Sequence, residues 1–203
     1  QALGKIKIDF DELGADFLTI SGHKIGAPSG IGALVYNNNF NLLPQILGGG
    51  QENGMRAGTE NILGIIGFGE AARIISELPE ITHSKVTCLR DYISNKIITL
   101  RPETVFLGDK VERVSNTILI ALPNTPGDLA LMKLDLANFS VSSGSACSSG
   151  KISKSHVVTA MGYDQLASNS IRISFPPNDF ILETERLITI QELDRLAECW
   201  SNI

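Results

Sequence analysis

The chain has 203 residues, of which 43% are hydrophobic and 19% are charged, a composition that supports a sizeable packed core and excludes an intrinsically disordered protein. Its formal net charge of −5, from 17 basic and 22 acidic side chains, excludes the basic excess by which proteins commonly bind nucleic acid. No apolar run approaches the length of a membrane span, because Gly64 and Gly67 interrupt the densest one, and no membrane association is expected.

The cysteines of the chain are few and odd in number. Cys88, Cys147 and Cys199 do not suggest a disulfide framework, and they favour a reducing, cytoplasmic compartment. No CxxC pair or HExxH motif predicts a metal site. The chain begins with Gln1 and enters an apolar stretch at once, so we expect it to be part of a longer protein.

The first predicted elements are two short strands, residues 17–20 and 31–36, on either side of a loop rich in Gly, Ser and Pro. Residues 47–61 contain several glycines and show no periodicity, which predicts a long, shaped loop of the kind that often carries function. A helix is predicted next, over residues 59–78, and its apolar character all round indicates that it is buried.

A second helix is predicted from the three- and four-residue spacing of apolar side chains between Val86 and Leu100. We expect a domain boundary in this region, with one domain over residues 1–85 and another over residues 86–203. Part of the second domain, from about residue 103 onward, is expected to fold on its own.

The remainder of the chain alternates predicted strands and helices. This alternation predicts an α/β fold. The predicted strands cover residues 105–107, 117–122, 140–142 and 171–175, and the predicted helices cover residues 126–136, 153–161 and 181–200.

A lysine directly follows the first strand, in the sequence Ser21-Gly22-His23-Lys24. Lys24 is expected to be partly desolvated there, which lowers the pKa of an ammonium group and suits an amine that forms a Schiff base. Ser21 and His23 add hydrogen-bond donors that suit an anionic phosphate group. These residues alone also fit an ordinary solvated lysine in a Gly-rich turn.

A cysteine lies within a run of small residues, SSGSACSSG, at positions 142–150. Because Cys147 has no large apolar neighbour, we expect it to be accessible, on a mobile loop that suits a travelling nucleophile. A surface cysteine without a function is the alternative. Cys88 and Cys199 are predicted to lie on helices.

Three segments resemble those of a known family. The segment FLTISGHKIGAPSGIGALVY resembles the lysine segment of the class V aminotransferases, enzymes of fold-type I that use pyridoxal 5′-phosphate (PLP). SSGSACSSG resembles the active loop of cysteine desulfurases of the iron–sulfur-cluster and nitrogen-fixation type. GGGQENGMRAGTEN resembles the GGGQERGxRxGTxN loop of these desulfurases, with Asn53 where Arg is usual. The resemblance implies part of a PLP-binding large domain followed by a small C-terminal α/β domain.

The resemblance also implies the roles of five residues at the cofactor. Lys24 would bind PLP covalently and act in catalysis. Ser21 and His23 would bind its phosphate group, and Gln1 its 3′-oxygen. Thr59 would reach the phosphate of a neighbouring subunit, which implies a homodimer. The family's Asp, His and Thr at the same site lie in a further stretch upstream, so this chain alone is expected to be inactive.

Substrate-binding roles are implied for Arg172 and Asn116, both near the carboxylate of the substrate. An alternating strand buries one face, and a buried guanidinium needs an anionic partner. Capping of a strand is an equally good alternative for Asn116. The implied reaction converts L-cysteine to L-alanine and leaves a persulfide on Cys147 for a sulfur acceptor or an iron–sulfur scaffold protein. A transaminase, a selenocysteine lyase and a non-catalytic fragment are the alternatives.

Overall fold

The computed structural model describes residues 1–77, 80–143, 154–175 and 190–203, with the backbone alone for residues 80–84. The chain divides into two compact units, residues 1–79 and 80–203. We refer to them as unit 1 and unit 2 and describe each by itself.

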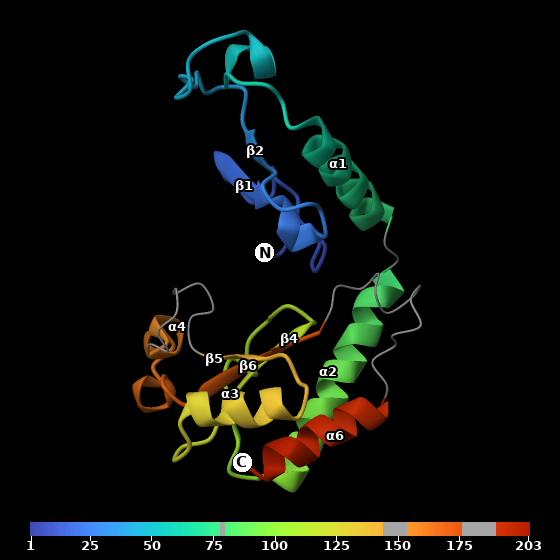
Figure 1. Ribbon diagram of the computed structural model, residues 1–203, viewed down its shortest axis with the longest axis vertical. Coiled ribbons are helices and arrows are strands. Elements are labelled where there is room, and N and C mark those ends of the chain that lie inside the picture. Colours follow the sequence, from blue (N-terminus) through green and yellow to red (C-terminus); the bar gives the residue numbers. More distant parts are fainter. Residues whose placement is uncertain (78–79, 144–153, 176–189) are drawn as a thin grey trace. The chain divides into compact units, whose positions relative to one another are not determined.

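Unit 1 is built on an antiparallel hairpin of two strands, β1 (Phe17–Ser21) and β2 (Gly32–Tyr36). Both strands were predicted. A single turn of 3-10 helix, η1 (Gly22–Ile25), begins the connection between them. The Gly-rich loop that follows contains a second such turn, η2 (Gln51–Gly54), and leads to helix α1 (Ile62–Glu77), drawn beside the hairpin in Figure 1.

Helix α1 begins at Ile62 because Asn61 caps it, accepting a hydrogen bond on Oδ1 from the backbone N–H of Gly64 at 3.1 Å. The predicted burial of this helix is wrong, since only Gly64 and Ala71 are buried and Leu63 is 83% exposed. Within the described residues, most of its apolar surface has no covering partner.

A small core joins α1 to the loop between the two strands. Gly67 allows the close approach, because a Cβ atom there would lie 2.6 Å from Cδ of Pro28. The loop is therefore held by packing against α1. The residues of this core are Ile25, Ala27 and Ala71, with Leu3, Ile31, Phe68 and Ile75 packed against them.

Unit 2 contains a four-stranded antiparallel sheet in the order β3-β4-β6-β5. The strands agree with the predicted ones to within a residue or two. They are β3 (Val105–Phe106), β4 (Thr117–Ala121), β5 (Ser142–Ser143) and β6 (Ser170–Ser174).

Five helices accompany this sheet in the described part of unit 2. The predicted helix at 126–136 is confirmed as α3, whereas the one at 153–161 is shorter, as α4. Residues 181–189 of the last predicted helix lie outside the described residues. The helices are α2 (Glu80–Leu100), α3 (Gly127–Leu136), α4 (His156–Ala160), η3 (Asp164–Leu166) and α6 (Ile190–Ser201).

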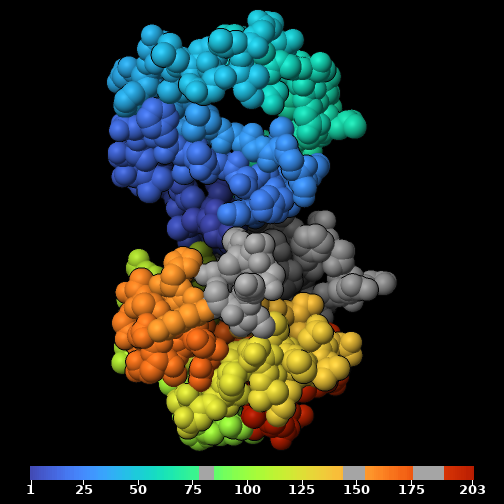
Figure 2. Space-filling view, turned by 60° about the vertical axis from the view of Figure 1, so that its left-hand side comes forward, coloured from blue at the N-terminus to red at the C-terminus, as the bar shows by residue number. Residues whose placement is uncertain are grey.

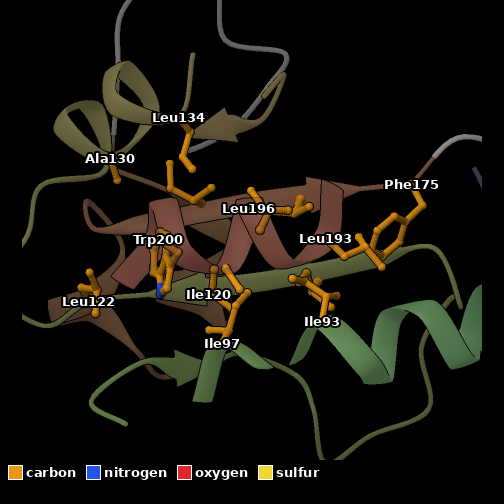
Figure 3. Packing of buried hydrophobic residues seen from close by; sticks show 14 of the residues in the cluster. Ile93, Ile97, Ile120, Leu122, Ala130, Leu134, Phe175, Leu193, Leu196 and Trp200 are labelled. Carbon is orange, nitrogen blue, oxygen red and sulfur yellow. The ribbon is translucent and has the colours of Figure 1, made fainter. Parts of the chain in front are cut away.

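The main core of unit 2 lies between the sheet and helices α2, α3 and α6 (Figure 3). Trp200 of α6 and Ile120 of β4 are fully buried in it, together with Ile93 and Ile97 of α2. The expectation of a self-sufficient unit from about residue 103 therefore differs from the structure, because α2 supplies part of the core. Among the described residues, no helix combines the length and the apolar character that a membrane span requires.

Candidate active site

The predicted cofactor lysine lies on η1, immediately after β1. Gly22 brings this turn close to the hairpin, since its N–H donates to the carbonyl of Ile31 at 2.9 Å. A Cβ atom at Gly22 would lie 2.8 Å from that same oxygen and 3.1 Å from the ring of Phe68. Glycine is therefore required here for close packing, and the turn is anchored through Gly22 and Ile25, which are both buried.

This anchoring leaves the polar side chains of the loop facing outward. Ser21, His23 and Lys24 are all exposed. The predicted partial desolvation of Lys24 is therefore wrong for the residues described, because the turn buries its glycine and isoleucine and not its lysine. The three groups are free to contact a ligand.

Gln1 lies near Lys24 although the two are far apart along the chain. The charges of Lys24 and Lys5 both act on the backbone nitrogen of Gln1, which indicates that the three residues lie close together. An amine, a hydroxyl, an imidazole and an amide around one cationic loop fit a cofactor such as PLP, which carries an aldehyde and a phosphate.

The Gly-rich loop, β2 and the start of α1 surround a hollow of about 1120 Å³, visible as the opening in unit 1 in Figure 2. Thr59 is exposed and lines this hollow, and Lys24 does not. Within the loop, Glu52 and Asn53 have left-handed backbone angles, φ +49° and φ +55°. Asparagine tolerates this conformation better than most residues, which gives a local structural reason for Asn at position 53.

Arg172 lies on β6, on the face of the strand opposite to the buried Ile171 and Ile173. The prediction that its guanidinium is buried is wrong, because the alternation of this strand turns Arg172 outward. One of its nitrogens, Nη2, donates to Oγ of Ser142 at 3.4 Å, and Ser142 is the register partner of Arg172 on β5. Sequence reasoning missed Ser142 in this role, because only the strand pairing identifies it.

Asn116 is buried and closes the end of the β4–β6 ladder. Its Nδ2 donates to the carbonyl of Phe175 at 3.0 Å, and its own carbonyl accepts from the N–H of Phe175 at 2.8 Å. The backbone N–H and the backbone carbonyl of Phe175 are therefore both bonded to Asn116. These contacts support the alternative of a strand cap that the sequence left open.

Cys147 falls in residues 144–153, outside the described residues. The segment that contains it begins directly after β5, with Ser143 as the last residue described before it. Three residues lie between Ser143 and Cys147, so the two are four residue steps apart, which an extended chain spans in at most about 14 Å. Cys88 is exposed on α2, and Cys199 is half-buried on α6.

A sequence model of the aminotransferase class-V family matches residues 1–187, and the chain therefore belongs to this family. Members of the family use PLP. Among curated proteins, the chain is 39% identical to a cysteine desulfurase of Trichormus azollae, matching 100% of this chain and 49% of that protein. It is 38% identical to a cysteine desulfurase IscS of Ehrlichia chaffeensis, matching 100% of this chain and 51% of that protein.

Among solved structures, a NifS-like protein from Rickettsia africae aligns with a TM-score of 0.82 at 36% identity, covering 98% of this chain and 50% of the other. A second NifS-like protein aligns with the same TM-score at 28% identity, covering 100% of this chain and 50% of the other. These matches confirm the predicted α/β fold class and its membership in fold-type I. The chain spans about half the length of the curated relatives that it matches.

Proposed function

We propose that the protein is a PLP-dependent cysteine desulfurase, which converts L-cysteine to L-alanine and forms a persulfide on Cys147. The position of Arg172 carries this proposal. Its guanidinium is exposed, has no carboxylate partner among the described residues, and lies directly beside β5, after which the segment with Cys147 begins. In this proposal, Arg172 binds the carboxylate of the amino-acid substrate and Cys147 takes its sulfur. The relatives named as cysteine desulfurases support the same reading.

In this proposal, Ser21 and the turn η1, which carries Lys24, form the lysine loop, and this loop holds the cofactor and moves protons. Lys24 binds PLP through its amine, and Ser21, His23 and Gln1 donate hydrogen bonds to it. When bound, PLP withdraws electrons from the α-carbon of the substrate. Nζ of Lys24 then accepts the proton of that carbon and later returns a proton to the substrate. The remaining cofactor contacts are proposed to come from outside these 203 residues, so that this chain alone is inactive.

Arg172 and Cys147 act on the other parts of the substrate. The guanidinium of Arg172 orients the carboxylate through two parallel hydrogen bonds. The thiolate of Cys147 attacks the substrate sulfur, the carbon–sulfur bond breaks, and its electron pair stays with the carbon, which takes up a proton to give alanine. The new sulfur–sulfur bond is the persulfide, so that the atoms of L-cysteine and the thiol are all accounted for.

The persulfide sulfur is proposed to pass to a sulfur-acceptor protein or an iron–sulfur scaffold protein in the cytoplasm. Thr59, which lines a hollow apart from Lys24, is proposed to serve the cofactor of a second subunit in a homodimer.

The test is mass spectrometry of the full-length, PLP-loaded protein after incubation with L-cysteine. The parent protein should gain about 32 Da, one sulfur atom, on Cys147. Cys147→Ser should gain none and should release no alanine, because a hydroxyl is a far poorer nucleophile toward sulfur than a thiolate. Cys88→Ser and Cys199→Ser are the matched controls and should behave as the parent does.

A persulfide on Cys88 or Cys199 in the Cys147→Ser variant, with alanine release at the parent rate, would contradict the assignment of the nucleophile. Amino-group transfer to an α-keto acid, unchanged by Cys147→Ser, would identify a transaminase instead.

A further inference from the structure

Arg172 differs from three other arginines of the chain in the chemistry of its partner. Arg73, Arg90 and Arg101 each form an ion pair with a nearby carboxylate. Arg172 contacts the neutral hydroxyl of Ser142, and within the described part of the chain no carboxylate lies within ion-pair distance of it. The partner that the described residues give this positive charge is therefore a neutral one.

A neutral partner suits an arginine that has to receive an anion. A guanidinium carries five N–H donors in one plane, and a single contact from Nη2 leaves the others for a bidentate carboxylate. On the opposite side of Arg172, its register partner on β4 is Leu119, which offers no competing polar group. Ser142 is thus the only side chain, among those described, with a hydrogen bond to this guanidinium.

The neighbouring serine on the same strand points elsewhere. A Cβ atom built on Gly127, at the start of α3, would lie 2.9 Å from Oγ of Ser143. Because successive side chains of a strand face opposite sides, Ser142 faces Arg172 and Ser143 faces α3. The strand therefore offers two adjacent serines, of which one touches the guanidinium and one does not.

We propose that Ser142 is a positioning residue, whose hydroxyl holds the Arg172 guanidinium in the orientation that binds the carboxylate of the amino-acid substrate. The inference rests on the proposed function, which assigns the carboxylate to Arg172. Ser142 touches the arginine and not the reacting atoms, so its removal acts on binding and leaves the chemical step nearly unchanged.

The experiment uses the full-length, PLP-loaded protein and L-alanine as the probe, with binding measured by calorimetry. In Ser142→Ala, the Kd for L-alanine and the KM for L-cysteine should both rise about 10- to 100-fold, the loss expected for one hydrogen bond to a charged group. The value of kcat should change by less than about twofold, because uniform binding is lost. Ser142→Thr keeps the hydroxyl and should bind as the parent does, and Ser143→Ala should also match the parent.

A double variant separates positioning from a direct role. In an Arg172→Ala background, Ser142→Ala should cause no further loss of L-alanine binding, because the group that it positions is gone. An additional loss there, an equal effect of Ser143→Ala, or a fall in kcat with unchanged L-alanine binding would each overturn the inference.

Failure of the proposed function has a different signature. A parent protein that binds L-alanine but releases none from L-cysteine would contradict the desulfurase activity, while the Ser142 comparison would still judge the positioning role. A parent protein that binds no L-alanine would overturn the inference itself.

Discussion

The lysine loop shows how packing and exposure divide the work among adjacent residues. Gly22 and Ile25 fix the turn from within, and Ser21, His23 and Lys24 face outward between and beside them. A change at the outward positions should therefore alter chemistry and leave the fold of the loop intact.

Lys24→Ala in the full-length protein should reduce alanine release from L-cysteine by about a thousandfold or more, because the group that holds the cofactor and moves the proton is lost. Lys7, which is exposed and belongs to no part of the proposed site, provides the control, and Lys7→Ala should keep the parent rate. The rate is measured by quantifying alanine. Alanine release near the parent rate in Lys24→Ala would refute the assignment of this lysine.

The buried pair Trp200 and Thr104 gives a second prediction at this scale. Nε1 of Trp200 donates to Oγ1 of Thr104 at 2.9 Å, and both side chains are buried. Thr104→Val keeps the shape of the side chain but leaves the indole N–H without its acceptor, so it should lower the free energy of unfolding by about 1–3 kcal/mol.

Urea unfolding of the 203-residue chain measures this change, with fluorescence as the signal, because Trp200 is the single tryptophan of the chain and lies in unit 2. Among the described residues, the hydroxyl of Thr99 donates only to the carbonyl of Asn95, four residues earlier on the exposed surface of α2. Thr99→Val should therefore shift the free energy of unfolding by less than about 0.5 kcal/mol. Equal stability of the two variants would show that the indole finds another acceptor.

Single residues could be proposed as site residues where a motif carried the information. Lys24 and its neighbours stand out because their sequence context is specific. The direction of Arg172 could not be predicted, because the face that a strand buries depends on which helices pack on the sheet. Ser142 was missed for the same reason, since its contact arises from strand pairing across 30 positions.

At the scale of elements, helices α2 and α6 are joined by polar contacts as well as by the core. The hydroxyl of Tyr92 donates to Oδ1 of Asp194 at 2.8 Å, and Nζ of Lys96 lies 3.1 Å from the same oxygen. The hydrogen bond from Tyr92, followed by that from Lys96, holds the pKa of Asp194 below its ordinary value of 3.8.

These contacts predict a dependence of stability on pH. Since the pKa of Asp194 is lower in the folded state than in the unfolded state, its contribution is present above pH 3.8 and is lost as the pH falls through the folded-state pKa. Asp194→Asn should therefore be less stable than the parent at about pH 7, and the difference should shrink by about pH 3. Urea unfolding at both values measures it, and a difference that stays constant with pH would argue against an ionised contact.

Periodicity predicted most elements of unit 2 because their apolar faces are buried against one another in the same unit. The apolar stripe of α6, for example, is buried in the main core through Leu193, Leu196 and Trp200. The same reasoning failed for the burial of α1, since an apolar surface indicates that a partner exists and not where that partner lies in the chain. The short edge strand β5 was also displaced in the prediction, because its position depends on pairing with β6.

At the scale of the molecule, the two units differ in how much of their core they contain. Unit 2 encloses its own core, to which α2 contributes the fully buried Val86, Ile93 and Ile97. A fragment over residues 80–203 should therefore fold cooperatively, whereas a fragment over residues 103–203 should not. Thermal unfolding followed by near-ultraviolet circular dichroism tests this, and a cooperative transition in the shorter fragment would show that α2 is dispensable.

Unit 1 exposes many large apolar side chains on its surface. Leu43, Leu47, Leu63 and Ile66 are each more than 60% exposed, and they lie on the Gly-rich loop, its approach and α1. In a solution of the 203-residue chain, such a surface binds apolar molecules. The fluorescence of an environment-sensitive dye such as anilinonaphthalene sulfonate should therefore increase with a fragment over residues 1–79 and change little with a fragment over residues 80–203. The same apolar surface should make copies of the chain aggregate. Storage and crystallisation of the chain therefore call for mild detergent or low concentration.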